Sequence, residues 1–267
     1  MPGIGQKMKI NIIGDTVGHH RKLSQYLWER GVVNHFEGQP FSAYDITFVM
    51  GANHLHAEHL AEGNPPVVVF ATGTDIFKLY GMGNTERKKE HLKKCALVLY
   101  VHKRAMDITG VKGKRWQIPY DDNLFYLRLP LPESQMRGTL IYCPKPDKYR
   151  LKDVLWYIVG HPEQTFTILG EATIALIACP PNTELVRYTE NLPDLMARHK
   201  KLMFWVTDEE MPDHPKINVI GCEALAMKLK VYVNGKQYYY LPKYMDKKIA
   251  LDELLEILEN VADKHGR

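Results

Sequence analysis

Pro215–Val233 reads PKINVIGCEALAMKLKVYV and is the most informative segment of this 267-residue chain. A turn leads into a helical run that carries one acid, Glu223, and an apolar, β-branched strand follows directly. In an α/β domain, the start of such a helix lies at the carboxyl edge of the sheet, where backbone N–H groups converge and phosphate-bearing ligands bind. We place Glu223 in the first helical turn, where a carboxylate complements the helix dipole or accepts hydrogen bonds from sugar hydroxyls.

A second segment with the same organisation lies in the first half of the chain. Residues 66–71, PVVVFA, form an apolar run typical of a strand that is buried on both faces. The run ends in a polar turn, Thr72-Gly73-Thr74-Asp75. Each half of the chain therefore contains a buried strand next to a turn that is suited to ligand binding.

Strands and helices alternate along the whole chain. We expect strands at residues 9–13, 46–50, 67–70, 96–101, 139–143, 165–169, 184–188 and 201–206, and a further strand after the Glu223 helix in the segment that ends at Val233. We expect helices from about residue 23 to Gly31, at 151–159, from Pro193 with Asn191 as its cap, around Glu223, and over 251–262. This alternation predicts mainly parallel sheets with right-handed crossovers. The glycine spacing after the first strand does not match Gly-x-Gly-x-x-Gly, so we expect no nicotinamide cofactor.

The prolines of Leu129-Pro130-Leu131-Pro132 forbid regular structure and indicate a linker. The chain is long enough for two cores of about 130 residues each. We therefore predict an α/β protein with two Rossmann-like domains, 1–132 and 133–267.

Composition narrows the class of protein. Hydrophobic residues make up 45% and charged residues 25%, as in ordinary globular proteins. No apolar run approaches the ~20 residues of a membrane span, and the first residues lack the apolar core of a secretory signal. The four cysteines are far apart, which favours reduced thiols over a zinc site. We expect a cytoplasmic protein, with peripheral attachment to a membrane surface left open, and we expect the histidines of segment 54–59 to bind no metal.

Charge is unevenly divided between the two halves. In residues 1–138, 18 Lys and Arg oppose 13 Asp and Glu, whereas 17 oppose 18 in the rest. A basic first half indicates an anionic partner, and a merely solvated helix face is the alternative for the basic run at 87–94.

The two segments together resemble the retaining glycosyltransferases of family 4. These enzymes have a strand that ends in a Gly-x-Asp turn in the first domain, and a Glu-Ala-hydrophobic-Ala helix followed by a strand in the second. Here Gly73-Thr74-Asp75 and Glu223-Ala224-Leu225-Ala226 match these motifs. The resemblance implies the GT-B fold, in which two Rossmann-like domains flank a cleft.

The resemblance also implies site residues. The catalytic carboxylates would be Asp75 and Glu223. The residues that bind the donor would be Gly18, Lys145, Lys148, Arg150, Lys216, Gly221 and Glu223. The acceptor side would hold Asp15, His19, His20, Thr72 and Thr74.

Several positions depart from the family pattern. Thr72 stands where the family has a histidine, and Pro215 occupies the place of the first of two paired glutamates. Lys145 replaces an arginine, and lysine lacks the bidentate fork that grips a diphosphate. The turn after Ile118-Pro119 also lacks the family's glycine.

The resemblance therefore implies a glycosyltransferase that uses a UDP- or GDP-type nucleotide sugar, without a metal or other cofactor. It also implies transfer with retention, and inversion with Asp15 or Asp75 as general base is left open. The acceptor would lie on the basic first domain, as a lipid-linked glycan at a membrane surface or a nucleic acid. Three alternatives remain open: a non-catalytic two-domain protein that binds sugar nucleotides, a sugar transferase that modifies DNA, and a sugar-nucleotide epimerase.

Overall fold

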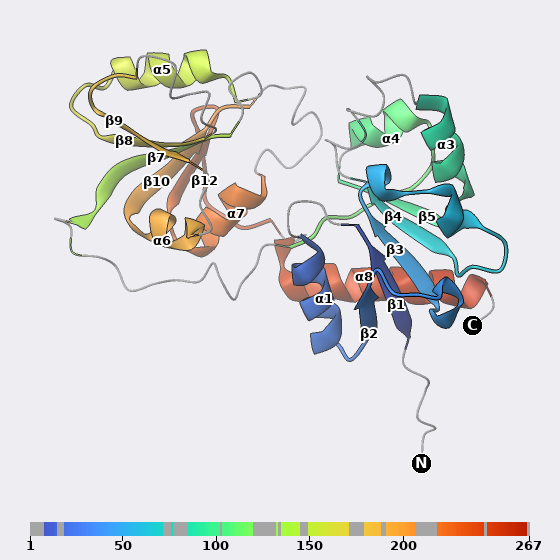
Figure 1. The fold of residues 1–267 in the computed structure, drawn as a ribbon. Helices are drawn as coiled ribbons and strands as arrows, with labels where there is room; N and C mark the ends of the chain where they lie inside the picture. Colours follow the sequence, from blue (N-terminus) through green and yellow to red (C-terminus); the bar gives the residue numbers. More distant parts are fainter. Residues whose placement is uncertain are drawn as a thin grey trace. The chain divides into compact units, whose positions relative to one another are not determined.

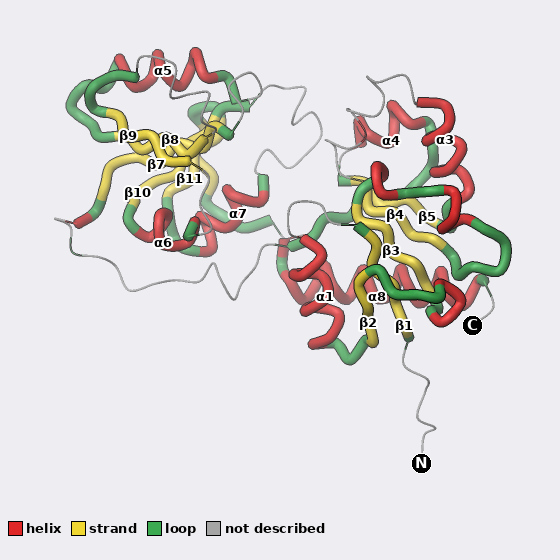
Figure 2. The backbone as a smooth tube through the Cα atoms, viewed as in Figure 1, coloured by secondary structure: helices red, strands yellow, loops and turns green. Residues whose placement is uncertain are grey.

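The computed structural model describes residues 8–14, 19–71, 76, 85–101, 103–119, 132, 135–144, 149–170, 179–187, 191–206, 218–242 and 245–265. The chain forms two compact units, Met1–Pro119 with Asp246–Arg267, and Tyr120–Met245. Each unit is a six-stranded sheet with helices packed on it (Figures 1 and 2). The prediction of an α/β protein with two Rossmann-like domains is confirmed.

The first unit contains a parallel sheet of order β2-β1-β3-β4-β5-β6. Its strands are β1 (Lys9–Ile13), β2 (Val33–Phe36), β3 (Ile46–Met50), β4 (Val67–Ala71), β5 (Leu97–Tyr100) and β6 (Lys114–Arg115). Its helices are α1 (His19–Glu29), α3 (Thr85–Lys94), α4 (Lys103–Thr109) and α8 (Lys247–Lys264), with 3₁₀ turns η1 (Phe41–Ala43), η2 (Ala52–His54) and η3 (Ala57–Leu60).

Successive side chains of the central strands pack alternately in two separate hydrophobic cores, because neighbours along a strand point to opposite faces of the sheet. In β4, Val68 and Phe70 pack with α1 and α8, whereas Val67 and Val69 pack with η2, α3 and α4. All five residues of β4 are buried. This explains why its sequence is continuously apolar rather than alternating.

The C-terminal helix belongs to the first unit, whereas the sequence prediction assigned residues 133–267 to the second. Leu254, Leu258 and Val261 of α8 are buried in the core with β1 and β3. Trp116 Nε1 donates to the carbonyl of Ala250 over 2.9 Å. The prediction was wrong on this point because an amphipathic stripe identifies a packing face but not the sheet on which it packs. The predicted boundary near residue 132 lies beside residues outside the described part.

The second unit contains a sheet of order β12-β11-β10-β7-β8-β9, parallel except for the last hairpin. Its strands are β7 (Arg137–Cys143), β8 (Phe166–Gly170), β9 (Thr183–Arg187), β10 (His199–Phe204), β11 (Lys230–Val233) and β12 (Lys236–Tyr238). Its helices are α5 (Leu151–Val159), α6 (Leu192–Ala197) and α7 (Val219–Ala226). In Figure 1, α5 covers one face of this sheet, and α6 and α7 cover the other.

Most predicted elements are confirmed, and the differences are local. Three short strands, β2, β6 and β12, were not expected, because two to four partly exposed residues leave little pattern to detect. Asn191 occupies the N-cap position of α6, but its side chain makes no capping hydrogen bond. All four cysteines are free, as predicted. Within the described ranges, no helix combines the length and hydrophobicity needed to cross a bilayer.

Candidate functional site

The second sheet has a topological switch point between β7 and β10. These strands are neighbours, but the chain continues from β7 through α5 to β8 on one side and from β10 through α7 to β11 on the other. Because α5 and α7 lie on opposite faces, the segments that follow the two strands diverge at the carboxyl edge (Figure 1). Open α/β sheets bind their ligands at such points.

Tyr149 and Asn218 connect the two diverging segments. Asn218 Nδ2 lies 3.4 Å from the Tyr149 hydroxyl, to which it donates. The buried Tyr149 ring packs edge-on against Tyr142, with centroids 5.1 Å apart, and Tyr142 contacts Phe204 in the same way. This aromatic row holds Tyr149 in place beside the start of α7.

The start of α7 presents backbone donors that have no acceptor within the helix. Asn218 is the N-cap, and its Oδ1 accepts from the Gly221 N–H over 3.0 Å. Cys222 N–H bonds the Asn218 carbonyl, so the helical ladder begins there. The N–H groups of Val219 and Ile220 precede that ladder and have no acceptor within the helix. Together with the helix dipole, they can stabilise a phosphate group.

Glu223 lies deeper in this helix than the sequence suggested. Since α7 begins at Val219, Glu223 is in the second turn, and the first turn contains no acid. The placement of Glu223 in the first turn was therefore wrong. Its side chain is buried, with 7% of the residue exposed. Burial, and to a lesser extent the charge of Glu223, raises the pKa of the adjacent Cys222 thiol, which stays protonated at neutral pH.

Arg150 begins α5 with a left-handed backbone, at φ 46° and ψ 53°. Its Nε donates to Asp153 Oδ2 over 2.5 Å, and the side chain is about half exposed. The ion pair orients the guanidinium and leaves its terminal N–H groups without a bond among the described residues. Arg150 follows Tyr149 directly, so this cation lies next to the switch point.

The first sheet has a corresponding switch point between β1 and β3. Gly14 follows β1 with φ +72°, and a Cβ atom built on it would lie 2.4 Å from His54 Cγ. The His54 side chain of η2 therefore fills the space that any larger residue at position 14 would need.

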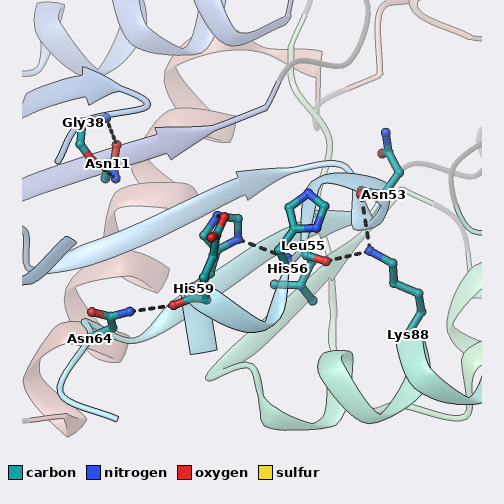
Figure 3. Close-up of polar contacts among 9 residues, drawn as sticks. Asn11, Gly38, Asn53, Leu55, His56, His59, Asn64 and Lys88 are labelled. Atoms are coloured by element: carbon teal, nitrogen blue, oxygen red, sulfur yellow. Dashed lines mark hydrogen bonds and ion pairs between the residues drawn. The ribbon is translucent and has the colours of Figure 1, made fainter. Parts of the chain in front are cut away.

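Lys88 holds the η2 turn from the neighbouring helix, as Figure 3 shows. Its Nζ donates to the carbonyls of Ala52, Asn53 and Leu55 at 3.3, 3.3 and 2.6 Å. Burial is the main cause that lowers the pKa of this ammonium, with the charge of Arg87 second. The main role of Lys88 is therefore to stabilise the backbone of the η2 turn.

The histidines of segment 54–59 have structural roles. His59 is buried, and its Nδ1 accepts from the His56 N–H over 3.2 Å (Figure 3). Its ring packs edge-on against Phe41. In the same view, Asn64 bonds the Glu58 carbonyl, and Asn11 exchanges two hydrogen bonds with Gly38. Among the described residues, no three His, Cys, Asp or Glu side chains are grouped as metal ligands.

The structure places only part of the predicted site. Arg150, Gly221 and Glu223 belong to the second unit, around the Tyr149–Asn218 contact. His19 and His20 begin α1, and their side chains are outside the described part. The other predicted residues also lie outside it: Asp15, Gly18, Thr72, Thr74, Asp75, Lys145, Lys148 and Lys216.

Sequence reasoning missed Tyr149, Asn218 and His54. Asn218 carried a detectable signal, because asparagine is a preferred N-cap residue directly before a helical run. Tyr149 and His54 carried none, since their importance depends on contacts with residues 69 and 40 positions away in the chain.

No family model and no curated protein matches this sequence. Several solved structures match it over almost the whole length of both chains. HepE from Anabaena, in complex with UDP-glucose, is 13% identical with a TM-score of 0.59, over 96% of this chain and 92% of HepE. An alpha-glucosyltransferase, in complex with UDP and a 13-mer DNA, is 9% identical with a TM-score of 0.63, over 97% and 93%.

A third match is the UDP-forming alpha,alpha-trehalose-phosphate synthase of Burkholderia xenovorans, 11% identical with a TM-score of 0.54, over 97% of this chain and 94% of that one. Because the sequence identities are so low, these matches establish the fold alone. The two Rossmann-like units of this chain therefore form a GT-B fold, and the chain is a structural match to the GT-B glycosyltransferases.

Proposed function

We propose that this chain is a glycosyltransferase that binds a nucleotide sugar at the carboxyl edge of its second sheet. The main support is the Tyr149–Asn218 contact, which joins the segments after β7 and β10 at the switch point and positions the start of α7. The fold agrees with this, because HepE and the alpha-glucosyltransferase were solved with UDP-glucose and UDP.

The diphosphate of the donor is the group that this edge is best suited to bind. The N–H groups of Val219 and Ile220 supply aligned dipoles, and Arg150 supplies a cation. We assign Lys145, Lys148 and Lys216 to the same group, with Gly18 close to the donor. Groups aimed at the phosphates stabilise the negative charge that develops on the leaving nucleotide, which lowers the barrier to transfer.

We assign the donor sugar to Asp75 and Glu223 and the acceptor side to Asp15, His19, His20, Thr72 and Thr74. Carboxylates bind sugar hydroxyls because each oxygen accepts hydrogen bonds and donates none. We propose transfer with retention, in which the leaving phosphate takes the proton of the acceptor hydroxyl.

The test is thermal stabilisation by UDP, GDP, ADP and TDP, followed by an assay for nucleotide release from the matching sugars. A ligand at about 100 times its dissociation constant adds roughly 2.7 kcal/mol to the folded state. Lys145→Ala is expected to weaken binding, whereas Lys152→Ala, an exposed lysine of α5 in the same unit, is the matched control. If no nucleotide raises the melting temperature, the donor site is wrong.

A non-catalytic sugar-nucleotide-binding protein is the second candidate. Thr72 and Pro215 favour it, because they stand where the resembling enzymes have a histidine and a glutamate. The nucleotide assays separate the two functions: stabilisation with release supports the transferase, and stabilisation without release from any sugar supports binding alone.

The excess of cations in residues 1–138 supports an anionic acceptor, either a lipid-linked glycan or DNA. Contacts with a polyanion weaken steeply as salt rises. Reversal of Arg87, Lys89 and Lys94 to glutamate should abolish salt-sensitive binding to anionic vesicles or to DNA. Lys88 is left unchanged in this variant, because it bonds three backbone carbonyls. Absence of binding to both polymers at low salt would contradict an anionic acceptor.

A further inference from the structure

A pocket of about 610 Å³ lies in the first unit between α3 and the segment that contains η2 and η3. This volume is in the range of small-molecule sites. Figure 3 shows Asn53, Leu55 and His56 on one side of this region and Lys88 of α3 on the other. All the described residues that line the pocket belong to the first unit.

The pocket has an excess of positive charge. Of the described residues that line it, Arg87 and Lys88 are cations and Glu58 is the one acid. The three donors of Lys88 are occupied by backbone carbonyls, so this residue contributes charge and a fixed wall rather than a free hydrogen bond. Arg87 is exposed and has no ion-pair partner among the described residues. Its guanidinium is therefore available to an anion.

His91 supplies a second donor one turn further along α3. Among the described residues, its Nδ1 is buried without a hydrogen-bond partner, and the half-buried ring lines the pocket. A buried N–H without an acceptor is unfavourable, so the proton of the neutral ring belongs on Nε2. Burial lowers the pKa of His91, and Lys88, Arg87, Lys94 and His56 act in the same direction.

We propose that this pocket binds the phosphate group of a small phosphomonoester, held by the Arg87 guanidinium and the His91 Nε2–H. Arginine matches the geometry of phosphate oxygens through its planar donors. Asn53, Leu55 and Ala57 provide mixed polar and apolar contacts for the organic part of the ligand. The site is separate from the proposed donor site, which lies in the other unit.

The experiment is a titration of ¹⁵N-labelled protein with inorganic phosphate and with glycerol 3-phosphate, followed by NMR of the histidine rings. We expect saturable shifts at His91 Nε2 that exceed those at the other histidines. Arg87→Gln should weaken binding about tenfold, the value of one charge-assisted hydrogen bond. Glu58→Gln should tighten it about twofold, because Glu58 is the one acid among the described residues of the pocket.

Lys93→Gln is the matched control, since Lys93 lies on the same helix but pairs with Glu90 and does not line the pocket. Equal weakening by Lys93→Gln and Arg87→Gln, or no saturable shift at His91, would overturn the proposal. Lysophosphatidic acid tests the source of the phosphate: tighter binding than glycerol 3-phosphate would indicate a lipid headgroup, and equal binding a soluble ligand. Stabilisation of Arg87→Gln by UDP reports on the donor site separately.

Discussion

At the switch point of the first sheet, the His54 ring fills the space beside Gly14, whereas at that of the second sheet Asn218 and Tyr149 meet through a hydrogen bond. The first arrangement is steric and leaves no room for a Cβ atom. The second is polar and leaves the N–H groups of Val219 and Ile220 without helical partners. Two sheets of related topology therefore differ in what their carboxyl edges can bind, because binding depends on the side chains and backbone groups at each edge and not on the topology.

The comparison treats the two sheets as parts of separate units, with α8 packed on the first. Leu258→Ala tests this assignment of α8 and has the largest expected effect. Leu258 is fully buried in the core of the first unit, so its truncation should cost about 3 kcal/mol. Hydrogen exchange should show lost protection in β1 and β3 and little change in β7 and β8. Ile249→Ala, at a residue 49% exposed on the same helix, is the control. Equal loss in both sheets would contradict the assignment.

Gly14→Ala tests the steric character of the first edge. The variant combines an unfavourable positive φ with a clash against His54, and we expect a loss of about 3 kcal/mol in unfolding free energy. Gly63→Ala has φ +84° and nothing within 4 Å of the new Cβ, so it should cost only about 1 kcal/mol. Chemical denaturation measures both. His54→Gly in the Gly14→Ala background removes all the His54 side-chain atoms that meet the new Cβ, and if it restores nothing, the contact is not the cause.

Asn218→Ala tests the polar character of the second edge. Loss of an N-cap should cost about 1 kcal/mol and should also weaken nucleotide binding, because the start of α7 is no longer fixed. Asp246→Ala removes the corresponding cap of α8, whose side chain accepts from Ile249 N–H over 3.0 Å. Calorimetry should show similar losses of stability in the two variants but weaker UDP binding only for Asn218→Ala. Identical UDP affinities would place the nucleotide elsewhere.

Within the described ranges, each unit contains one buried histidine, His59 or His199, and both predict a small dependence of stability on pH. Desolvation is the main cause that lowers the pKa of His59 and of His199. The contribution is fully present above the unfolded value of about 6.5. As pH falls below that value, the unfolded chain binds protons first, so stability is lost until the folded pKa is passed. His199→Gln should reduce the change in the urea unfolding midpoint between about pH 8 and pH 5. The exposed control His35→Gln should leave this change as it is in the unmodified protein. An unchanged slope would contradict this.

Much of the secondary structure was predictable from the sequence. The segments PVVVFA and LKDVLWYIV correspond to β4 and α5, whose predicted ranges agree with the structure within one residue. Gly31 follows α1 with φ +75°, as expected of a helix terminator. These features are local: burial on two faces, helical periodicity and backbone freedom leave a pattern in consecutive residues.

The sequence alone therefore determined the alternation of strands and helices and, through it, two Rossmann-like sheets. The tertiary structure alone decided that α8 joins the first unit, that Glu223 lies in the second turn of α7, and that Tyr149 meets Asn218. Trp116 and Ala250 are 134 residues apart, and Lys88 reaches carbonyls more than 30 residues away. Such contacts depend on how the elements pack in space, and they cannot be predicted from the pattern of neighbouring residues in the sequence.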